Sequence, residues 1–219
     1  MPVGSVGAGG QWREVPDVPA EPAAGGAAPP AAVSSLPAGE RAGARRVATN
    51  LGPAPGTEVV FSGSRWRPVA PVVLLTQNTF MAKTDADANW QTGVSVTLPA
   101  GLVGPGTALR CDYMLSCSAS VLGAKEIRWL WGGQVVNMQS FGLEQDFRGL
   151  FQAQALGANS VQGWWQGGAV VFGASAPAFT QAAVDHSQQQ TLAMQFRFAV
   201  AGTGSNTLTL RGLKVWLDP

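Results

Sequence analysis

The sequence predicts an all-β fold, a β-sandwich or jelly roll preceded by an extended, Ala/Gly/Pro-rich N-terminal arm. Three observations support this fold class. Apolar and polar residues alternate along much of residues 89–219, as on strands with one buried face. Turns rich in Gly and Pro separate these runs. Helical periodicity is nearly absent, so no crossover helices are expected between the strands.

Residues 1–44 differ in character from the rest of the chain. Ala, Gly and Pro dominate them, and such a segment alone buries too little surface to offset its ordering entropy. One interpretation is a disordered linker. The other is an attachment arm that becomes ordered on neighbouring subunits. Trp12 and its neighbour Arg13 favour the arm, because an indole is costly to leave in water and the prolines already favour an extended chain.

Residues 45–88 predict a small β-hairpin connector. Short strand candidates at 45–49 and 57–61 precede a longer one at 65–75, and Ser62-Gly63-Ser64 is typical of a tight hairpin turn. Pro68 and Pro71 cannot donate hydrogen bonds to a neighbouring strand. The longer strand is therefore expected along a sheet edge or between sheets.

Residues 89–219 predict one continuous distal β-sandwich with a jelly-roll-like arrangement. Buried faces are expected within 94–98, 127–131 and 192–200, and Gly132-Gly133 ends the second of these strands. A short helical turn is an alternative within residues 178–190. In the last strand the apolar parity changes between Leu210 and Leu213, which predicts a β-bulge at Arg211-Gly212.

The two cysteines, Cys111 and Cys117, lie on a single predicted strand. Their thiols share one face of it, about 20 Å apart at ~3.3 Å per residue. A disulfide needs Cα atoms within roughly 7 Å, so the two are expected to stay free and buried. The same separation makes a metal site at this pair improbable.

Composition excludes several classes of partner. Charged residues make up 12% of the chain and the formal net charge is +1, which gives no long-range field for nucleic acid or an anionic membrane. No apolar run is long enough for membrane insertion, and the start lacks the pattern of a signal peptide. Synthesis and assembly in a cytoplasm are expected. The balance suits an assembly subunit or a protein that binds neutral polar ligands such as glycans.

Catalytic residues are not predicted, and the chain is expected not to be an enzyme. The single histidine, His186, stands between Asp185 and Ser187, and three consecutive residues do not form a catalytic triad. Glycoside hydrolysis needs two carboxylates flanking a cleft. The candidates are Asp85, Asp87, Asp112, Glu126, Glu144, Asp146 and Asp185, and the sequence singles out no pair among them.

No metal site or cofactor is predicted. Asp85, Asp87 and Asn89 place oxygen ligands at alternate positions, like the start of a calcium loop. Trp90 then replaces the required glycine, and Val96 replaces the glutamate. A loop with Asx turns is the preferred interpretation, and weak calcium binding is the alternative.

Adjacent tryptophans supply the candidate binding residues. Trp164 and Trp165 follow Gly163, and consecutive residues of a strand face opposite sides of the sheet. One interpretation buries one indole in the core and the other between subunits. The other interpretation exposes an indole for stacking on sugar rings, with amides beside it for hydrogen bonds. The candidate glycan-binding residues are Trp164, Trp165, Gln166 and Gln162.

The segment GTEVVFSGSRWRPVAPVVLL resembles a short β motif of tail-fibre and spike-like proteins of tailed phages. The runs SQQQTLAMQF and LTLRGLKVWL resemble the distal β domain that follows this motif in those proteins. The resemblance covers about residues 45–219. The motif residues are Gly63, Arg65, Trp66, Arg67 and Pro68, followed by Val69.

The resemblance implies a virion structural protein, either a tail fibre or a head spike, assembled in the host bacterial cytoplasm. Such proteins are usually homotrimers, and their tips recognise host surface polysaccharide or a protein receptor. The N-terminal arm would attach to other virion proteins, and binding would proceed without bond cleavage. Two alternatives are a capsid decoration protein that stabilises the shell and a spike that degrades glycans.

Overall fold

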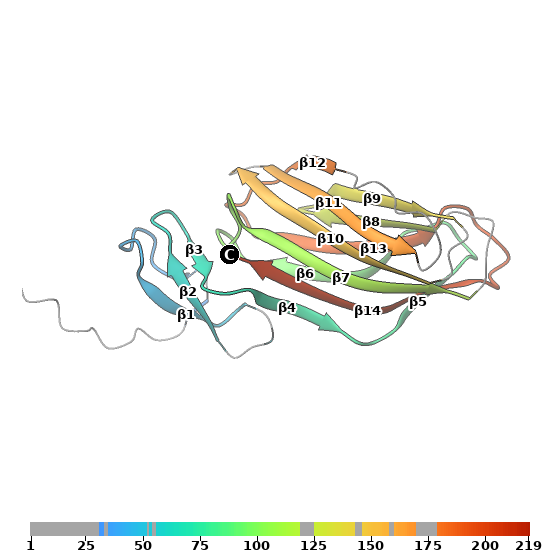
Figure 1. Ribbon diagram of the computed structural model, residues 1–219, viewed down its shortest axis with the longest axis horizontal. Helices are drawn as coiled ribbons and strands as arrows, with labels where there is room; N and C mark the ends of the chain where they lie inside the picture. The colour runs from blue at the N-terminus through green and yellow to red at the C-terminus, as the bar shows by residue number, and fades with distance from the viewer. Residues whose placement is uncertain are drawn as a thin grey trace, which may run out of the picture.

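The computed structural model describes residues 31–32, 35–51, 53, 56–118, 125–142, 146–157, 160–169 and 179–219. Antiparallel strands form three sheets in these residues, and none of the residues lies in an α-helix. Two of the sheets face each other, and the third lies at one end of them (Figure 1). The predicted all-β sandwich is therefore confirmed. No described helix has the length and apolar character needed to cross a bilayer.

The small sheet has the order β1-β2-β3 and contains β1 (Arg45–Ala48), β2 (Thr57–Phe61) and β3 (Trp66–Pro68). The predicted hairpin joins β2 to β3. At its turn Gly63 has a φ of 93°, which favours glycine, and the Ser62 amide donates to the Arg65 carbonyl at 2.9 Å. From here on, the connector means residues 35–70, which include this sheet, and not the whole predicted range 45–88.

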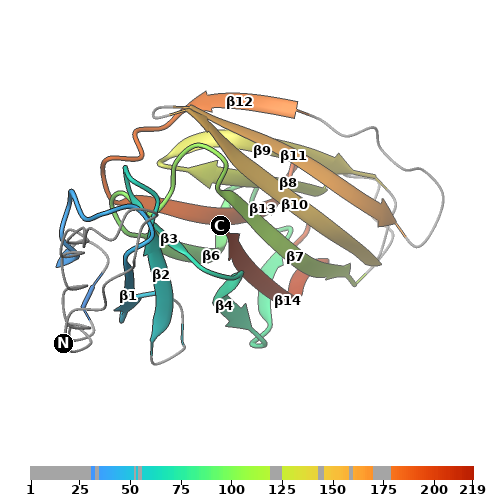
Figure 2. The ribbon, with the colours of Figure 1, turned by 60° about the vertical axis from the view of Figure 1, so that its left-hand side comes forward.

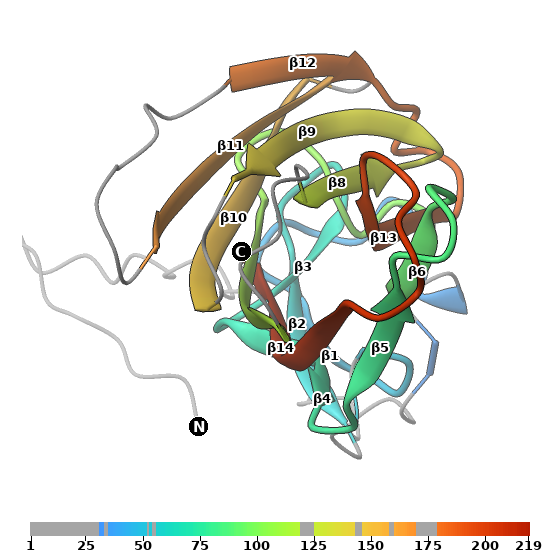
Figure 3. The same cartoon turned by 90° about the vertical axis from the view of Figure 1, so that its right-hand side faces the viewer.

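The larger sheet has the order β12-β11-β10-β7-β14-β4, and β5 also pairs with β14. Its strands are β4 (Val72–Gln77), β5 (Met81–Thr84), β7 (Ala108–Cys117), β10 (Asp146–Gly157), β11 (Ser160–Ala169), β12 (Phe179–Ala183) and β14 (Thr207–Asp218). β4 and β5 belong to the predicted range 45–88 but pair within this sheet. Seen end-on, the sheet curls past its partner (Figure 3).

The smaller sheet has the order β6-β13-β8-β9. Its strands are β6 (Gln91–Leu98), β8 (Lys125–Trp131), β9 (Gln134–Phe141) and β13 (Gln190–Phe198). Gly132 and Gly133 form the turn between β8 and β9, as predicted. At one side β11 and β12 of the larger sheet contact β9, which closes that side of the sandwich (Figure 2).

Aromatic side chains join the two sheets in the core. Trp129 of β8 stacks on Phe151 of β10, with ring centroids 4.6 Å apart and planes 5° from parallel. Phe141 of β9 stacks on Phe147 of β10 at 4.1 Å. All four side chains are buried, and burial of a side chain this large stabilises a fold by about 1.5–3 kcal/mol.

Both cysteines lie on β7 and are buried and free, as predicted. Burial in an apolar environment raises the pKa of the Cys111 thiol, because it disfavours the thiolate. Neither thiol is therefore in a setting that favours reactivity.

The predicted strand at 65–75 is broken into β3 and β4, and the chain passes between two sheets there, as expected from its prolines. Pro68 ends β3 in the small sheet, Pro71 follows it, and β4 begins at Val72 on an edge of the larger sheet. The missing amide hydrogens of the two prolines therefore fall at a strand end and between strands. The alternative of a helical turn near residue 180 is wrong. Phe179–Ala183 is β12, whose backbone pairs with β11 instead of forming local hydrogen bonds.

Residues of the Trp-Arg-Pro motif hold the connector together and attach it to the sandwich. The Arg65 guanidinium donates to Thr107 Oγ1 at 2.6 Å and to the carbonyls of Leu102 and Pro105 at 3.2 and 2.7 Å. Trp66 is buried, and its indole N–H donates to the Pro37 carbonyl at 3.0 Å. Arg67 and Pro68 lie on β3, paired with Val60 and Val59. Trp12 and Arg13 lie outside the described residues.

Close approach of two backbones explains one glycine of β11. A Cβ atom on Gly163 would lie 2.3 Å from the Val136 carbonyl oxygen of β9. A Gly163→Ala variant is therefore expected to lose about 1–3 kcal/mol of unfolding free energy, because the sheets must separate at this side. Gly212→Ala is the matched control, since its nearest atom would lie 3.9 Å away. Urea unfolding measures both, and equal midpoints would contradict this account.

Candidate functional site

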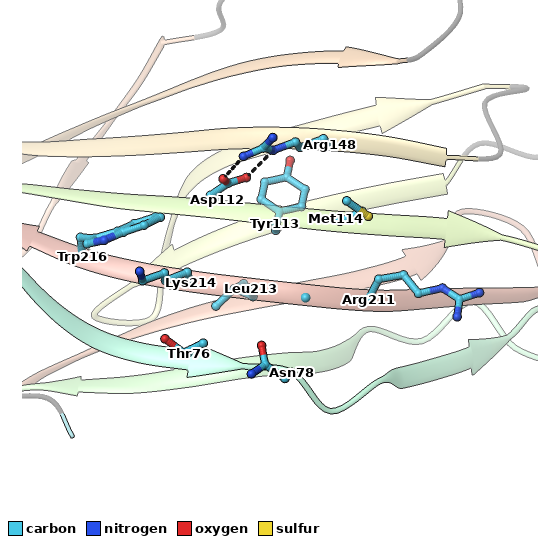
Figure 4. Close-up of a pocket in the computed structure, with 11 residues that line it drawn as sticks. Thr76, Asn78, Asp112, Tyr113, Met114, Arg148, Arg211, Leu213, Lys214 and Trp216 are labelled. Carbon is cyan, nitrogen blue, oxygen red and sulfur yellow. Dashed lines mark hydrogen bonds and ion pairs between the residues drawn. The ribbon is translucent and has the colours of Figure 1, made fainter. Parts of the chain in front are cut away.

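The outer face of the larger sheet carries a shallow groove of about 500 Å³ across β4, β14, β7 and β10. We call it the Trp216 groove. Its polar and aromatic lining includes Asn78, Asp112, Arg148, Arg211, Lys214 and Trp216 (Figure 4). Trp216 lies at one end of the groove and Arg211 at the other.

The β-bulge in β14 places three of these side chains on the outer face. Leu208 and Leu210 are buried before the bulge, and Leu213, Val215 and Leu217 are buried after it. The register with β7 shifts between Leu210 and Gly212, so the predicted bulge is confirmed. Without the extra residue, Lys214 and Trp216 would share the parity of Leu210 and face the core. The bulge instead places Lys214 and Trp216 on the outer face, the same face as Arg211.

Asp112 and Arg148 form a two-point ion pair between β7 and β10. Arg148 Nε donates to Asp112 Oδ1 at 2.9 Å, and Nη2 donates to the other carboxylate oxygen. The carboxylate raises the pKa of Arg148, first through this hydrogen bonding and then through its charge. The arginine side chain is 68% exposed, so water and salt screen the pair and it contributes little to stability. Its main effect is to hold two polar groups in a defined position on the sheet.

Trp216 is a partly exposed indole with two cations beside it. Lys214 Nζ lies 4.9 Å from its ring centroid, and Arg110 Cζ lies 5.9 Å from it. Arg110 also donates to Asp218 Oδ1 through Nη2 at 2.8 Å. The indole belongs to a strand paired on both sides, so the backbone that carries it is held in place. An aromatic surface with charged and amide groups nearby suits recognition of a polar ligand by stacking and hydrogen bonding.

A second depression of about 490 Å³ lies between the connector and the sandwich. Asp185, His186 and Ser187 line it together with Arg65. Asp185 Oδ1 accepts from the Ser187 hydroxyl at 2.7 Å, while His186 Nε2 lies 3.4 Å from the Ser160 carbonyl. The His186 Nδ1 atom has no hydrogen-bond partner among the described residues. Burial lowers the pKa of His186 and favours the neutral ring. The serine is therefore bonded to the carboxylate and not to the imidazole, unlike the order in a catalytic triad.

Neither of the two depressions in the described residues contains two of the carboxylates considered for glycoside hydrolysis. The Trp216 groove contains Asp112, and the second depression contains Asp185. Glu126 is paired with Arg197 at 2.7 Å on the smaller sheet. Asp146 lines neither depression, and Glu144 lies outside the described residues.

The calcium-like loop uses its carboxylates for contacts within the chain. Buried Asp85 accepts from the Asn206 side chain at 2.6 Å, and its own carbonyl accepts from the Gly202 amide at 2.5 Å. Asp87 accepts from Lys83 Nζ and from the Asn89 amide, both at 2.7 Å. The second of these bonds is the expected Asx turn. In the described residues no cluster of three or more acidic, His or Cys side chains converges as a metal site would.

The sequence-predicted glycan residues lie on β11, two strands away from Asp112. The backbone of Gln166 pairs with Leu150, which pairs with Asp112. Trp164 pairs with Gln152, in the cross-strand row that continues through Arg110 to Trp216. Trp165 pairs with Phe151, and Gln162 pairs with Gln154. The side chains of these four predicted residues lie outside the described part of the structure, so the prediction stays untested.

Sequence reasoning missed Trp216, Lys214 and the Asp112–Arg148 pair as site residues. A signal for the first two was present in the last strand. Once Leu213, Val215 and Leu217 are assigned to the core, the residues between them must face outward. A tryptophan at such a position indicates a binding surface. The ion pair gave no comparable signal, because Asp112 and Arg148 are 36 residues apart in the sequence.

No family model matches the chain, and no curated protein matches it. Among solved structures it is similar to the CBM2 module of the evolved Dit protein of Lactobacillus casei BL23 phage J-1, at 7% identity over 56% of this chain and 67% of that one, with a TM-score of 0.33. Arcelin-5, a lectin-like defence protein of Phaseolus vulgaris, gives 6% identity, coverage of 68% and 99%, and a TM-score of 0.36. A CBM36 carbohydrate-binding module in complex with calcium and xylotriose is 9% identical over 67% of this chain and 99% of that one, with a TM-score of 0.25. Such low scores do not establish a common fold or function.

Acid is expected to weaken the Asp85 contact. Hydrogen bonds from Asn206 hold the pKa of Asp85 below its usual range. The stability that the carboxylate contributes is therefore complete above about pH 4 and is lost as the pH falls through the folded-state value. Urea midpoints measured across this range should fall less steeply for Asp85→Asn than for the unaltered chain. Parallel curves would contradict the assignment. Asp146→Asn is the control, because this exposed carboxylate has no hydrogen bond or ion pair among the described residues.

Proposed function

We propose that the chain is a non-enzymatic carbohydrate-binding protein whose Trp216 groove takes the glycan. The observation that carries this proposal is a partly exposed indole in an open groove with polar groups on neighbouring strands. The C–H face of a pyranose ring stacks on an aromatic ring, and its hydroxyls both donate and accept hydrogen bonds. Asp112 on β7 supplies oxygens that accept hydrogen bonds from the hydroxyls. Arg148 on the neighbouring strand β10 supplies N–H donors for them.

The open shape of the groove favours binding of a chain over enclosure of a small molecule. It extends across strands that belong to one continuous sheet, with Trp216 at one end and Arg211 at the other (Figure 4). A polymer can cross such a groove, with one residue on Trp216 and others toward Arg211. The groove holds a single carboxylate, so it lacks the pair that glycoside hydrolysis uses. Binding without cleavage is therefore the proposed activity.

Loss of the indole is expected to weaken glycan binding. Trp216→Ala should weaken binding to bacterial surface polysaccharides on an array at least about tenfold. A stacking contact on an aromatic side chain contributes ~1–3 kcal/mol when the partner is a nucleobase, and we expect a similar size for a sugar ring. Trp90→Ala is the matched control. Trp90 is also partly exposed and lies 4.2 and 4.3 Å from arginine guanidinium carbons, but on the smaller sheet. Equal binding by Trp216→Ala and the unaltered chain would remove the groove from the proposal.

Filling the groove tests the same site without deleting a contact. Gly212 lines it, and a Cβ atom there would meet no atom closer than 3.9 Å. Gly212→Leu is expected to keep the urea midpoint and to lose polysaccharide binding, because the larger side chain occupies the ligand's place. Gly212→Ala should retain most of the binding. Full binding by the leucine variant would contradict the proposed location.

We further propose that the chain is a virion appendage, a tail fibre or head spike, in which this sandwich faces the host cell. The Trp-Arg-Pro motif and the Ala/Gly/Pro-rich arm support this role, the arm as the point of attachment to other virion proteins. Sheet edges such as β4 are available for contacts between copies, as expected in a homotrimer. A capsid decoration protein remains the second candidate, since an arm and a β domain also suit a clamp between shell subunits.

The position of the protein on the particle separates these two roles. A gold-tagged antibody against residues 90–219 is expected to label discrete projections at the tail tip or the head vertices. Even labelling over the shell would contradict the appendage and support decoration. As a control, the antibody is first absorbed with the purified protein, which should remove the label from every position.

A further inference from the structure

The outer face of the larger sheet holds more cations than carboxylates around the Trp216 groove. Of the carboxylates on this face, Asp112 and Asp218 are each paired with an arginine. The third, exposed Asp146, pairs through its backbone with Ser116 and has no ion pair among the described residues. Arg148 takes both oxygens of Asp112, and Arg110 pairs with Asp218. Lys214 and Arg211 are left without a carboxylate partner among the described residues, and both line the groove.

Lys214 is held over the indole. Its backbone pairs with Asp112, but Arg148 already binds that carboxylate from the other side. The ammonium lies 4.9 Å from the Trp216 ring centroid, with no hydrogen-bond acceptor among the described residues. A sugar that stacks on Trp216 would therefore meet this charge directly. A hydroxyl accepts only a weaker hydrogen bond from the ammonium. A carboxylate accepts a stronger one, because both groups are charged.

Arg211 supplies a second cation at the other end of the groove (Figure 4). Its Nε donates to Ser116 Oγ at 2.6 Å, and its guanidinium carbon lies 5.0 Å from the ring centroid of exposed Phe80. These contacts orient the side chain and leave both Nη groups without a partner in the described part of the chain. A guanidinium edge of this kind binds a carboxylate or sulfate through two parallel hydrogen bonds.

We propose that the ligand of the Trp216 groove is an acidic polysaccharide, with carboxylate or sulfate groups that pair with Lys214 and Arg211. This inference rests on the proposed glycan-binding function. The two residues are three positions apart on β14, with the bulge between them, and their side chains extend toward opposite ends of the groove (Figure 4). That separation suits anionic groups on successive sugars of one chain.

The selectivity arises from the groove and not from the whole protein. The formal net charge is only +1, so no long-range field collects anions. Composition alone suggested neutral glycans for this reason. Because the two cations are accessible to water, their pairing with a ligand is screened by salt, over a distance of about 8 Å at physiological ionic strength. Binding of the acidic polymer should therefore weaken as sodium chloride is raised.

Matched polymers test the inference. An array carries acidic polysaccharides such as alginate and hyaluronan, sulfated polymers, and the carboxyl-reduced, neutral form of each uronic acid polymer. The full chain is expected to bind acidic members and to bind each reduced form about tenfold more weakly or worse. Lys214→Gln and Arg211→Gln should each lower binding to the acidic form and leave binding to the reduced form unchanged.

Arg41→Gln is the matched control, because it removes one exposed cation from the connector with the same change in net charge. Equal binding to acidic and reduced polymers, together with loss in Trp216→Ala, would overturn the acidic ligand and keep the glycan-binding function. Failure to bind any polymer would overturn both. A loss in Arg41→Gln equal to that in Lys214→Gln would also overturn the inference, since it would reflect overall charge alone.

Discussion

Contact between the rings of Trp129 and Phe151 is the interaction on which the sandwich depends. The two residues come from the smaller and the larger sheet, and their stacked rings set the spacing between the sheets. Tyr113 of β7 packs against the same indole at 5.7 Å, so a third strand is tied to this position. Because the inner face is filled in this way, every strand must keep its apolar parity inward. The outer faces are then free to carry polar and aromatic side chains.

The bulge at Arg211-Gly212 connects this constraint to the candidate site. β14 is twelve residues long, pairs with β4, β5 and β7, and must bury leucines and valines at both of its ends. One extra residue allows the parity to change while the core stays filled. The consequence is that Lys214 and Trp216 point away from the core, on the same outer face as Arg211. A device required for packing therefore also builds the groove.

The connector is attached by a different type of contact. Arg65 reaches the loop before β7 through three hydrogen bonds, and Gly104 leaves room for its guanidinium because a Cβ atom there would lie 2.8 Å from it. Burial lowers the pKa of Arg65, but an arginine remains charged, so its hydrogen bonds to carbonyl and hydroxyl oxygens compensate for lost hydration. The motif that suggested a phage appendage thus has a structural role in this chain. Its arginine joins two parts of the protein, and its tryptophan packs inside one of them.

The sequence alone determined the all-β class, the strands with clear alternation, the hairpin at Gly63, the free cysteines and the bulge, because each depends on local alternation or on the geometry of a few residues. It also implied that Trp216 faces outward. It did not identify β9, β10 or β12 as strands. It did not determine strand order, so it could not show that Asp112 meets Arg148, or that β14 lies between β4 and β7. Pairing between distant strands depends on how whole faces bury against one another, and no short stretch of residues contains that information. The groove is a property of four neighbouring strands, and only the tertiary structure brings them together.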